Sequence, residues 1–568
     1  MSSGLSPTPP SPWEHIELNH FVGAAFAYVG LAGVGLAILF QLPSFIRHLR
    51  KQGKYGYILF TSNRFENLVP NSSQDENKIV LSSSHSIRNG WWFIRKSLMT
   101  RIPFTNGLSI GKLSILIIYI GLSILFALYK NSDENGLINY KRFGFLAISQ
   151  LPITFGLSMK NSPLGYLIGE GYEKLNFLHR FTGRLIFIFG LIHWALLMRL
   201  QIKATGRIKI KESPYVWGFS AIVAMLCMGL TGWKVIRERF YQIFMLTHVL
   251  GYLVVIVTLW YHVNETHPYI STAIAFLVLD HVLKALKTKY TDATISAIPG
   301  GLTRFEVHCI PDGWRAGQHV FIRVLNGRNM FEKHPFTIAN APRHSSFSTS
   351  GQDLVLVAKA AGDFTKRIHS LAINSSEGLT EKIKDLDELS PPKNNVRLLV
   401  EGPYGVCFED FTEFETVFLC AGGSGFSYCM GVLEEIVGKA VGEGSIATKR
   451  IEVVWVFRDR RYVKGYEEAV DGVIRAASSR PVITINMWLY HTTSNQDISN
   501  SENNLSADLP TGRPDFPSLM SGIVEDSKSL AVGVCGPIAL VDSVQNAMRG
   551  IDTKGLNKIA IHSERFGW

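Results

Sequence analysis

Four histidines in two apolar segments are the residues of this sequence best suited to chemistry. His179 and His193 lie in LNFLHRFTGRLIFIFGLIHWALL, and His248 and His262 lie in YQIFMLTHVLGYLVVIVTLWYHV. Each pair is 14 residues apart, which is almost four helical turns, so both members lie on one face of a helix. The rise over this interval is roughly 21 Å, which is most of the ~30 Å hydrocarbon core of a membrane. Two such helices packed together would hold two histidine couples at two depths, and a couple that fills both axial positions of a haem iron suits electron transfer.

A histidine in an apolar run has a second interpretation, as a hydrogen-bonded residue of the core or of the membrane interface. The repeated spacing on a second apolar helix argues against this interpretation, and so does the cost of an ionisable side chain inside a membrane. Because two ligands of one iron must lie at equal depth, we expect His179 to face His248 and His193 to face His262.

The composition indicates a multi-pass membrane protein. The chain is 46% hydrophobic and 18% charged, which is too apolar for a soluble protein of 568 residues. Its net charge of +11 comes from basic residues that flank apolar segments, so we expect no nucleic-acid partner. We predict seven spans, over Phe21–Leu42, Leu108–Tyr129, Phe143–Leu157, Phe177–Leu197, Val216–Trp233, Phe244–Tyr261 and Tyr269–Leu286.

Basic residues predict the orientation of these spans. With the N-terminus outside, the inner loops hold nineteen Lys and Arg against eight in the outer loops. The segment after Lys287 is then cytosolic. The basic outer segment 199–213 departs from the rule, and it either binds an anion or is a solvated loop. Arg180 and Arg184 beside His179 either pair with haem propionates or anchor the helix at the interface.

The pattern changes after Lys289 from long apolar runs to short alternating ones. RFEVHCI, HVFIRVL, DLVLVAK and VRLLVEG predict an antiparallel β-barrel over roughly 290–405. From Thr416, strands alternate with a Gly-rich turn and helices, which predicts an α/β domain with a parallel sheet. We therefore expect four parts: 1–105 (N-terminal tail, first span and cytoplasmic loop), 106–289 (transmembrane haem domain), 290–410 (β-barrel) and 411–568 (α/β domain with a polar insertion at 491–515).

A Gly-rich turn, AGGSGFSY (421–428), follows an apolar strand and opens a helix. Gly422, Gly423 and Gly425 allow the backbone to approach a phosphate, and the helix N-terminus supplies amide donors to it. Such a turn is often only a turn, but its place between a strand and a helix favours a dinucleotide site.

HPFTIAN (334–340) and GDFT (362–365) establish a family resemblance. Together with EGPYG (401–405), VWVFRDR and the CGP of 535–537, they show that residues 105–568 resemble the ferric reductase/NADPH oxidase superfamily, and most of all its fungal-type ferric/cupric reductases. The resemblance implies a multi-domain chain. An all-α transmembrane haem-binding helical bundle would be followed by a ferredoxin-reductase-like module, with an antiparallel β-barrel FAD domain and an α/β NADPH domain.

The resemblance also implies which residues hold the cofactors, and it assigns no catalytic acid or base. The irons of two b-type haems would be bound by His179, His193, His248 and His262. FAD would be bound by His334, Pro335, Phe336, Thr337, Gly362, Phe364 and Thr365, with Phe566 or Trp568 stacked on the flavin. NADPH would be bound by Gly422, Gly423, Ser424, Gly425, Arg458, Cys535, Gly536 and Pro537, with Arg458 on the 2′-phosphate and the CGP residues by the nicotinamide.

The activity implied is that of a metalloreductase, which passes electrons from cytosolic NADPH through FAD and two haems to extracytoplasmic Fe³⁺ or Cu²⁺ chelates and so supports metal uptake. A superoxide-generating NADPH oxidase is the alternative, and the equal spacing of both histidine pairs favours the reductase. A haem-containing scaffold without activity is a third class, which the intact nucleotide motifs disfavour. The plasma membrane is the expected location, with the vacuole or another endomembrane as alternatives. Association with a metal permease or oxidase stays open.

Overall fold

The computed structural model describes residues 12–51, 97–98, 100, 108–131, 138–168, 170–310, 312–346, 353–380, 394–405, 410–442, 446–479, 483–492, 512–553 and 555–565. The chain forms two compact units, a helical one within residues 1–283 and a mixed one that takes in residues 284–567.

The helical unit has the features of a multi-pass membrane domain. Its helices are α1 (Pro12–Lys51), α3 (Ile110–Leu128), α4 (Tyr140–Ser149), α5 (Leu151–Ser158), α6 (Pro163–Ile168), α7 (Tyr172–Thr205), α8 (Tyr215–Thr231), α9 (Lys234–Arg239), α10 (Tyr241–His262), η2 (Asn264–Thr266) and α11 (His267–Leu286). Within the described residues, five helical segments are long and apolar enough to cross a membrane: Leu18–Leu39, Ile110–Leu128, Tyr172–Thr205, Tyr241–His262 and Asn264–Leu286. The shorter α8 is also apolar. The multi-pass character predicted from composition is therefore confirmed.

The predicted span Phe143–Leu157 is two helices, α4 and α5, which meet at Gln150. Pro152 explains the break, because proline has no N–H to donate and its ring crowds the carbonyl four residues earlier. The carbonyl of Leu146 accepts a hydrogen bond from Nε2 of the Gln150 side chain, at 2.8 Å. Most of α4 is buried, so its polar residues are shielded from lipid.

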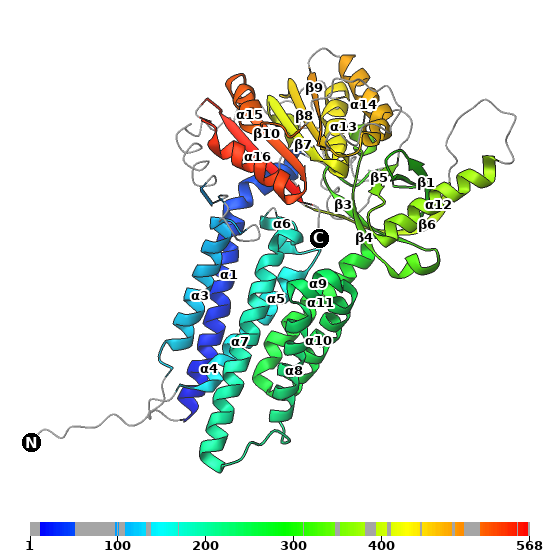
Figure 1. Ribbon diagram of the computed structural model, residues 1–568. Helices are drawn as coiled ribbons and strands as arrows, with labels where there is room; N and C mark the ends of the chain where they lie inside the picture. Colours follow the sequence, from blue (N-terminus) through cyan, green and yellow to red (C-terminus); the bar gives the residue numbers. More distant parts are fainter. Residues whose placement is uncertain are drawn as a thin grey trace, which may run out of the picture. The chain divides into compact units, whose positions relative to one another are not determined.

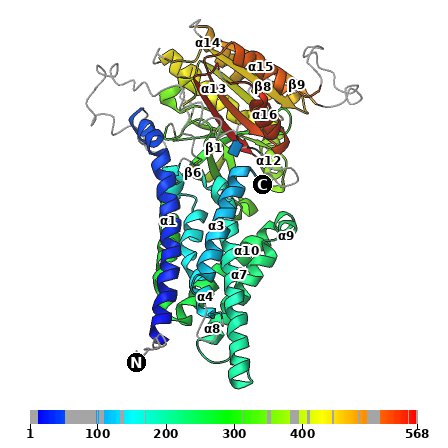
Figure 2. The same cartoon turned by 90° about the vertical axis from the view of Figure 1, so that its left-hand side faces the viewer.

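Helices α7, α8 and α10 run alongside one another in both views of the helical unit (Figures 1 and 2). Helices α4 and α5 pack on α7, and α8 packs on α10. Phe189 of α7, Ala221 of α8 and Val255 of α10 are buried in the same core. This packing positions the two helices that carry the four histidines.

The mixed unit begins with a six-stranded antiparallel sheet. Its strands are β1 (Thr288–Ile298), β2 (Leu302–Val307), β3 (His319–Val324), β4 (His334–Thr337), β5 (Leu354–Lys359) and β6 (Asn394–Tyr404), in the order β4-β3-β6-β1-β2-β5. A bridge between Ile338 and Leu356 joins the two edges, so the sheet forms a nearly closed barrel. Phe305, Ile322 and Val400 fill its interior. Helix α12 (Asp363–Thr380) packs against β1 and β2. The predicted antiparallel barrel is confirmed.

A five-stranded parallel sheet follows. It contains β7 (Thr416–Gly422), β8 (Arg450–Phe457), β9 (Thr484–His491), β10 (Ser529–Gly536) and β11 (Lys558–Arg565), in the order β11-β10-β7-β8-β9. Helices α13 (Phe426–Gly442) and α14 (Arg461–Ser478) cover one face, and α15 (Phe516–Glu525) and α16 (Ile538–Gly550) cover the other (Figure 1). Each face has its own core, because successive strand residues point to opposite sides.

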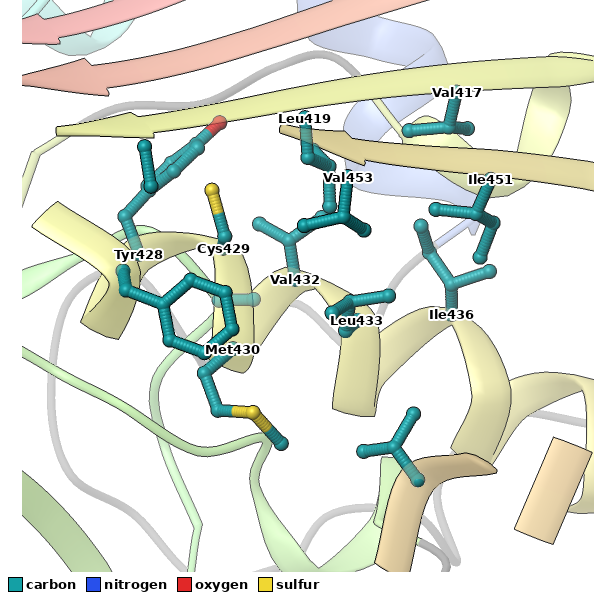
Figure 3. Close-up of a cluster of buried hydrophobic side chains, with 14 of the residues drawn as sticks. Val417, Leu419, Tyr428, Cys429, Met430, Val432, Leu433, Ile436, Ile451 and Val453 are labelled. Carbon is teal, nitrogen blue, oxygen red and sulfur yellow. The ribbon is translucent and has the colours of Figure 1, made fainter. Parts of the chain in front are cut away.

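The two cores show this alternation along β7. Val417 and Leu419 lie in the core under α13, whereas Phe418 and Cys420 lie in the core under α15 and α16. Figure 3 shows the first core, in which Ile436 of α13 faces β7 and β8. The predicted α/β domain with a parallel sheet is confirmed. Most of the insertion predicted at 491–515 lies outside the described residues.

Candidate functional site

The four histidines lie on α7 and α10 and form two couples. In the first couple, the ring centres of His179 and His248 are 6.2 Å apart. In the second couple, those of His193 and His262 are 6.3 Å apart. Two imidazoles that bind one metal ion from opposite sides at ~2.0–2.1 Å hold their ring centres roughly 6 Å apart. Each couple therefore has the separation that bis-histidine ligation of one iron needs.

Backbone carbonyl groups of α4 and α5 orient both histidines of α7. Nδ1 of His179 lies 2.9 Å from the carbonyl oxygen of Thr154, and Nδ1 of His193 lies 2.9 Å from that of Tyr140. A carbonyl oxygen only accepts, so Nδ1 of each ring carries the hydrogen and donates it. Nε2 then keeps the lone pair that binds a metal ion. The sequence could not identify these partners, because every residue has a carbonyl group.

The two histidines of α10 are held in different ways. Nδ1 of His262 lies 3.0 Å from the carbonyl oxygen of Pro214, just before α8, and donates to it. Nδ1 of His248 is buried and has no hydrogen-bond partner in the described part of the chain. The His248 ring instead packs between the rings of Phe244 and Tyr252, whose centres are 5.4 Å and 6.4 Å away. Three rings are thus fixed by hydrogen bonds and one by packing.

Glycines leave room around both couples. A Cβ added to Gly144 would lie 3.0 Å from Nδ1 of His193, and one added to Gly218 would lie 2.7 Å from Cε1 of His262. The rings of the second couple therefore lie directly on helix backbone. At Gly183, one turn along α7 from His179, an added Cβ would meet nothing within 4 Å. The ring separations, the Nε2 atoms of the three hydrogen-bonded rings and this open space fit haem groups that these histidines would hold.

In the mixed unit, the HPFT and GDFT motifs lie against each other. HPFT forms β4, and α12 begins within GDFT, at Asp363. The ring of His334 stacks on that of Phe364 with the centres 4.2 Å apart. Thr365 Oγ1 accepts a hydrogen bond from the backbone N–H of Gly362, which shapes the turn before the helix. A strand beside a helix N-terminus fits FAD, because the strand can line the flavin and the helix amides can bind the pyrophosphate.

A half-buried carboxylate, Glu332, also contacts His334. Glu332 Oε1 lies 2.8 Å from Nη2 of Arg367, and Glu332 Oε2 lies 3.5 Å from Nε2 of His334. Burial, more than any neighbouring charge, lowers the pKa of His334 below its usual value. The imidazole is therefore neutral at neutral pH, which suits a ring that packs beside Phe364 and a flat aromatic cofactor.

The predicted nucleotide motifs follow β7, β8 and β10, whose carboxyl ends lie at one edge of the parallel sheet. A Cβ added to Gly422 would lie 2.7 Å from Cδ of Pro537, and one added to Gly536 would lie 3.2 Å from the backbone nitrogen of Gly422. The Gly-rich turn and the CGP turn are therefore in direct contact. Gly423 has φ +54°, and an added Cβ there would meet nothing within 4 Å, so its backbone faces open space. Ser424 and Gly425 complete the short turn before α13.

Two residues that the sequence did not single out hold the turn and the arginine in place. Nε1 of Trp455 donates to the carbonyl oxygen of Gly423 at 3.0 Å, and its ring stacks on Phe426 with the centres 3.9 Å apart. His491, at the end of β9, places Nε2 2.9 Å from the carbonyl oxygen of Arg458 and donates to it. Arg458 itself is exposed just beyond β8. The signal for both residues is only their position at strand ends next to the motifs.

Cys535, the first residue of the CGP motif, is buried. Burial, with Cys429 nearby, raises the pKa of the Cys535 thiol well above its usual value. The thiol therefore stays protonated at neutral pH. This side chain adds a small, uncharged surface beside the site and does not act as a nucleophile. Phe566 and Trp568, the candidates for stacking on the flavin, lie outside the described residues.

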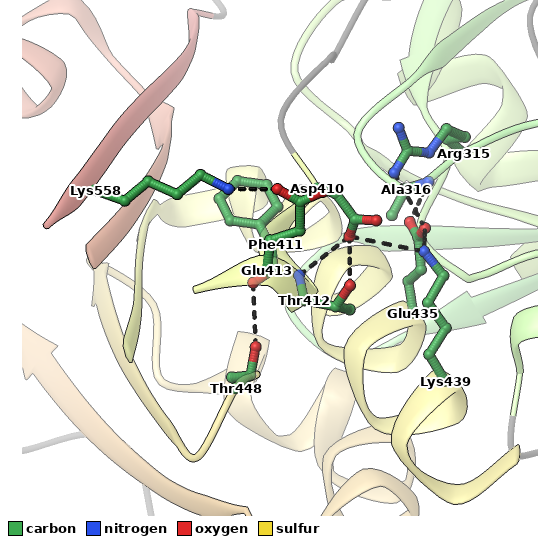
Figure 4. Close-up of polar contacts among 10 residues, drawn as sticks. All are labelled: Arg315, Ala316, Asp410, Phe411, Thr412, Glu413, Glu435, Lys439, Thr448 and Lys558. Atoms are coloured by element: carbon green, nitrogen blue, oxygen red, sulfur yellow. Dashed lines mark hydrogen bonds and ion pairs between the residues drawn. The ribbon is translucent and has the colours of Figure 1, made fainter. Parts of the chain in front are cut away.

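A buried charge cluster joins the barrel to α13 (Figure 4). Nζ of Lys439 lies 2.7 Å from Glu435 Oε1 and 3.9 Å from Asp410 Oδ1, and Nη2 of Arg315 lies 3.5 Å from Glu435 Oε1. Burial alone would raise the pKa of the Asp410 carboxyl, but Lys439, Arg315 and hydrogen bonds from Thr412 outweigh burial and hold the pKa at about 2. No sequence motif marks this cluster, because its members come from three separate segments.

Comparison with protein families matches three consecutive segments. Residues 143–259 match a ferric reductase like transmembrane component, 289–407 an FAD-binding domain and 414–549 a ferric reductase NAD binding domain. The first match contains His179, His193 and His248. The resemblance predicted from the motifs is therefore confirmed, as is the ferredoxin-reductase-like organisation of the mixed unit.

Curated relatives are fungal ferric and cupric reductases. Ferric/cupric reductase transmembrane component 2 of Saccharomyces cerevisiae is 25% identical over 71% of this chain and 58% of that protein. Ferric reductase transmembrane component 6 of the same yeast is 24% identical over 72% of this chain and 57% of that protein. A probable cell surface ferric reductase of Aspergillus oryzae is 24% identical over 58% of this chain and 44% of that protein. The chain thus spans about half the length of these relatives.

Proposed function

We propose, from its three matched transmembrane, FAD-binding and NAD-binding segments, that the chain belongs with the ferric reductases and is an NADPH-dependent metalloreductase. It would transfer electrons from cytosolic NADPH across a membrane to ferric or cupric chelates. One observation carries the proposal: the helical unit holds two histidine couples with ring centres 6.2 Å and 6.3 Å apart. Each couple suits one haem, and two haems at two depths make an electron path through a membrane.

Bound FAD would supply the conversion of a two-electron hydride donor into a one-electron donor, and bound haems would carry single electrons. The residues of this chain bind and orient these groups. The amides around Gly423 would bind the pyrophosphate of NADPH, and Arg458 would pair with its 2′-phosphate, because a guanidinium binds phosphate through two hydrogen bonds. The N-terminus of α12 and β4 would hold FAD. No proton transfer by a side chain is needed, in keeping with the protonated Cys535 and the neutral His334.

The histidines would do more than bind iron. Because Nδ1 of His179, His193 and His262 donates to a backbone carbonyl, each of these rings keeps one tautomer and one orientation. If both histidines of a couple hold one haem iron, they would leave no position for another ligand, and the acceptor would receive its electron without binding to the metal. A one-electron oxidant such as chelated Fe³⁺ or Cu²⁺ suits this transfer.

We further propose that the N-terminus is outside and that the mixed unit is in the cytosol of the cell, with the plasma membrane as the location. The excess of Lys and Arg in the predicted inner loops supports this orientation. An electron that moves outward across a membrane that is negative inside gains ~2.3 kcal/mol per 100 mV. The metal ion reduced outside would be a substrate for a permease, which is the class of partner that we propose.

The test is anaerobic NADPH oxidation by the purified, haem-loaded full chain with ferric citrate as the acceptor. We expect Fe²⁺ to form without oxygen. The variant His193→Ala should lose ferric reduction and keep reduction of its flavin by NADPH, since the second couple lies beyond the flavin on the proposed path. Turnover that requires oxygen and yields superoxide would instead make the chain an oxidase. Full ferric activity in His193→Ala would overturn the two-haem path.

A further inference from the structure

A carboxylate lies next to the arginine that is proposed to bind the 2′-phosphate. Asp459 directly follows Arg458 in the loop between β8 and α14. At this edge of a nucleotide-binding sheet, an acidic side chain accepts hydrogen bonds from the ribose hydroxyl groups of NADH and repels the 2′-phosphate of NADPH. Asp459 alone would therefore work against Arg458.

The side chain of Arg461 forms an ion pair with the Asp459 carboxylate. Nε of Arg461 lies 3.0 Å from Oδ1 and 3.2 Å from Oδ2 of Asp459, and Nη2 lies 2.8 Å from Oδ2. The backbone N–H of Arg461 donates to Oδ1 at 3.0 Å as well. Both carboxylate oxygens thus accept hydrogen bonds from one residue, in the two-pronged geometry that arginine forms with carboxylates.

The charges in this loop agree with the geometry. Burial raises the pKa of the Asp459 carboxyl, but the hydrogen bonds from Arg461 outweigh burial and leave the pKa below its usual value. Asp459 is therefore ionised and paired at neutral pH. The Arg461 side chain is 73% exposed, against 26% for Asp459, so solvent meets the guanidinium more than the carboxylate. With Arg458 and Arg460 beside this pair, the loop presents positive charge.

We infer that Arg461 is a specificity-determining residue, which favours NADPH over NADH by occupying the Asp459 carboxylate. This inference rests on the proposed function, because it requires NADPH at the edge that carries Arg458. Arg461 would not need to touch the nucleotide. It would act by removing an acceptor for the NADH ribose and a repulsive charge from the site of the 2′-phosphate.

The experiment compares kcat/KM for NADPH and for NADH in the full-length, FAD-loaded protein, with anaerobic bleaching of the flavin as the readout. Arg461→Gln should lower the NADPH-to-NADH ratio by about tenfold, the order expected for one unscreened charge near a phosphate. The change should lie in KM, with kcat preserved. Asp459→Asn should keep the NADPH preference, and the double variant Asp459→Asn/Arg461→Gln should regain most of the lost ratio.

Arg475→Gln is the matched control, because Arg475 is an exposed arginine on the same helix α14 and lies away from Asp459. Its ratio should equal that of the unchanged protein. An unchanged ratio in Arg461→Gln would overturn the inference. A ratio that stays low in the double variant would also overturn it, since Arg461 would then bind the phosphate directly. Arg458→Ala distinguishes failure of this inference from failure of the proposed function. If Arg458→Ala also leaves the NADPH-to-NADH ratio unchanged, the proposed NADPH site itself is wrong.

Discussion

Tyr140 and Thr154 lie 14 residues apart on α4 and α5, and their carbonyl oxygens accept hydrogen bonds from Nδ1 of His193 and His179, which lie 14 residues apart on α7. Thr154, the later of the two carbonyl residues, contacts His179, the earlier of the two histidines, so the α4–α5 segment runs antiparallel to α7. The same 14-residue spacing therefore occurs in both segments. The two hydrogen bonds fix the rotation of both imidazole rings. The break between α4 and α5 lies between the two carbonyl residues.

Gly218→Ala should cost the chain about half of its haem. The added methyl group would lie 2.7 Å from Cε1 of His262, so the ring must leave the position in which it faces His193. The measurement is haem content per FAD in the purified protein. Gly229→Ala, on the same helix α8, is the control, because its added Cβ would meet nothing within 4 Å. Equal haem in the two variants would contradict the placement of the second couple.

Trp455→Phe should raise KM for NADPH by about fivefold, with kcat little changed. It removes the hydrogen bond from Nε1 to the Gly423 carbonyl, and a bond of this kind contributes about 1 kcal/mol. The control is Trp488→Phe on the neighbouring strand β9, which removes a hydrogen bond to Glu452 instead. A similar KM for both variants would show that the indole does not hold the turn.

The mixed unit should lose stability between about pH 4 and pH 2. The pKa of Asp410 is about 2 in the folded protein and 3.8 when unperturbed, so its ionised form stabilises the fold above the higher value. This contribution, about 2 kcal/mol, disappears as the pH falls through the lower value. Thermal unfolding followed by release of FAD fluorescence measures it. In Asp410→Asn the midpoint should depend less steeply on pH over this range, and an identical slope would count against the cluster.

Lys439→Met should destabilise the mixed unit by roughly 3 kcal/mol, because it leaves the buried carboxylates of Glu435 and Asp410 with fewer partners. The unfolding midpoint should fall by several degrees. Glu435→Gln/Lys439→Met should recover part of the loss, because the double variant removes a buried charge along with its partner. If the double variant is less stable than the single one, the Lys439–Glu435 contact is not the origin of the effect.

Sequence patterns predicted the helical bundle from long apolar runs, the barrel from short alternating runs, and the parallel sheet from strands that alternate with helices. The four histidines could be found in the same way, since side-chain chemistry and spacing are written in the sequence. Their carbonyl partners at Tyr140, Thr154 and Pro214 could not, because a carbonyl group has no sequence identity. The break in the span over 143–157 was missed although Pro152 marks it, since the apolar run continues past the proline.

The charge cluster of Arg315, Asp410, Glu435 and Lys439 could not be predicted for a different reason. Its members come from the barrel, the linking segment and α13, and only the packing of the two domains brings them together. Trp455 and His491 could be predicted in part: their positions could, but their contacts could not. Both lie beside recognisable motifs, but their hydrogen bonds to Gly423 and Arg458 depend on how neighbouring strands align.

The contact between Gly422 and the CGP turn affects how such motifs should be interpreted across a family. A methyl group on Gly422 would collide with Pro537, and one on Gly536 would collide with Leu540 and crowd the backbone of Gly422. Selection for folding alone would therefore preserve both glycines, even in a relative that had lost its nucleotide. Gly423, which faces open space at a positive φ, has no such packing neighbour. Its replacement by a residue that tolerates a positive φ, such as asparagine, meets no packing barrier and would be the better record of a lost nucleotide site.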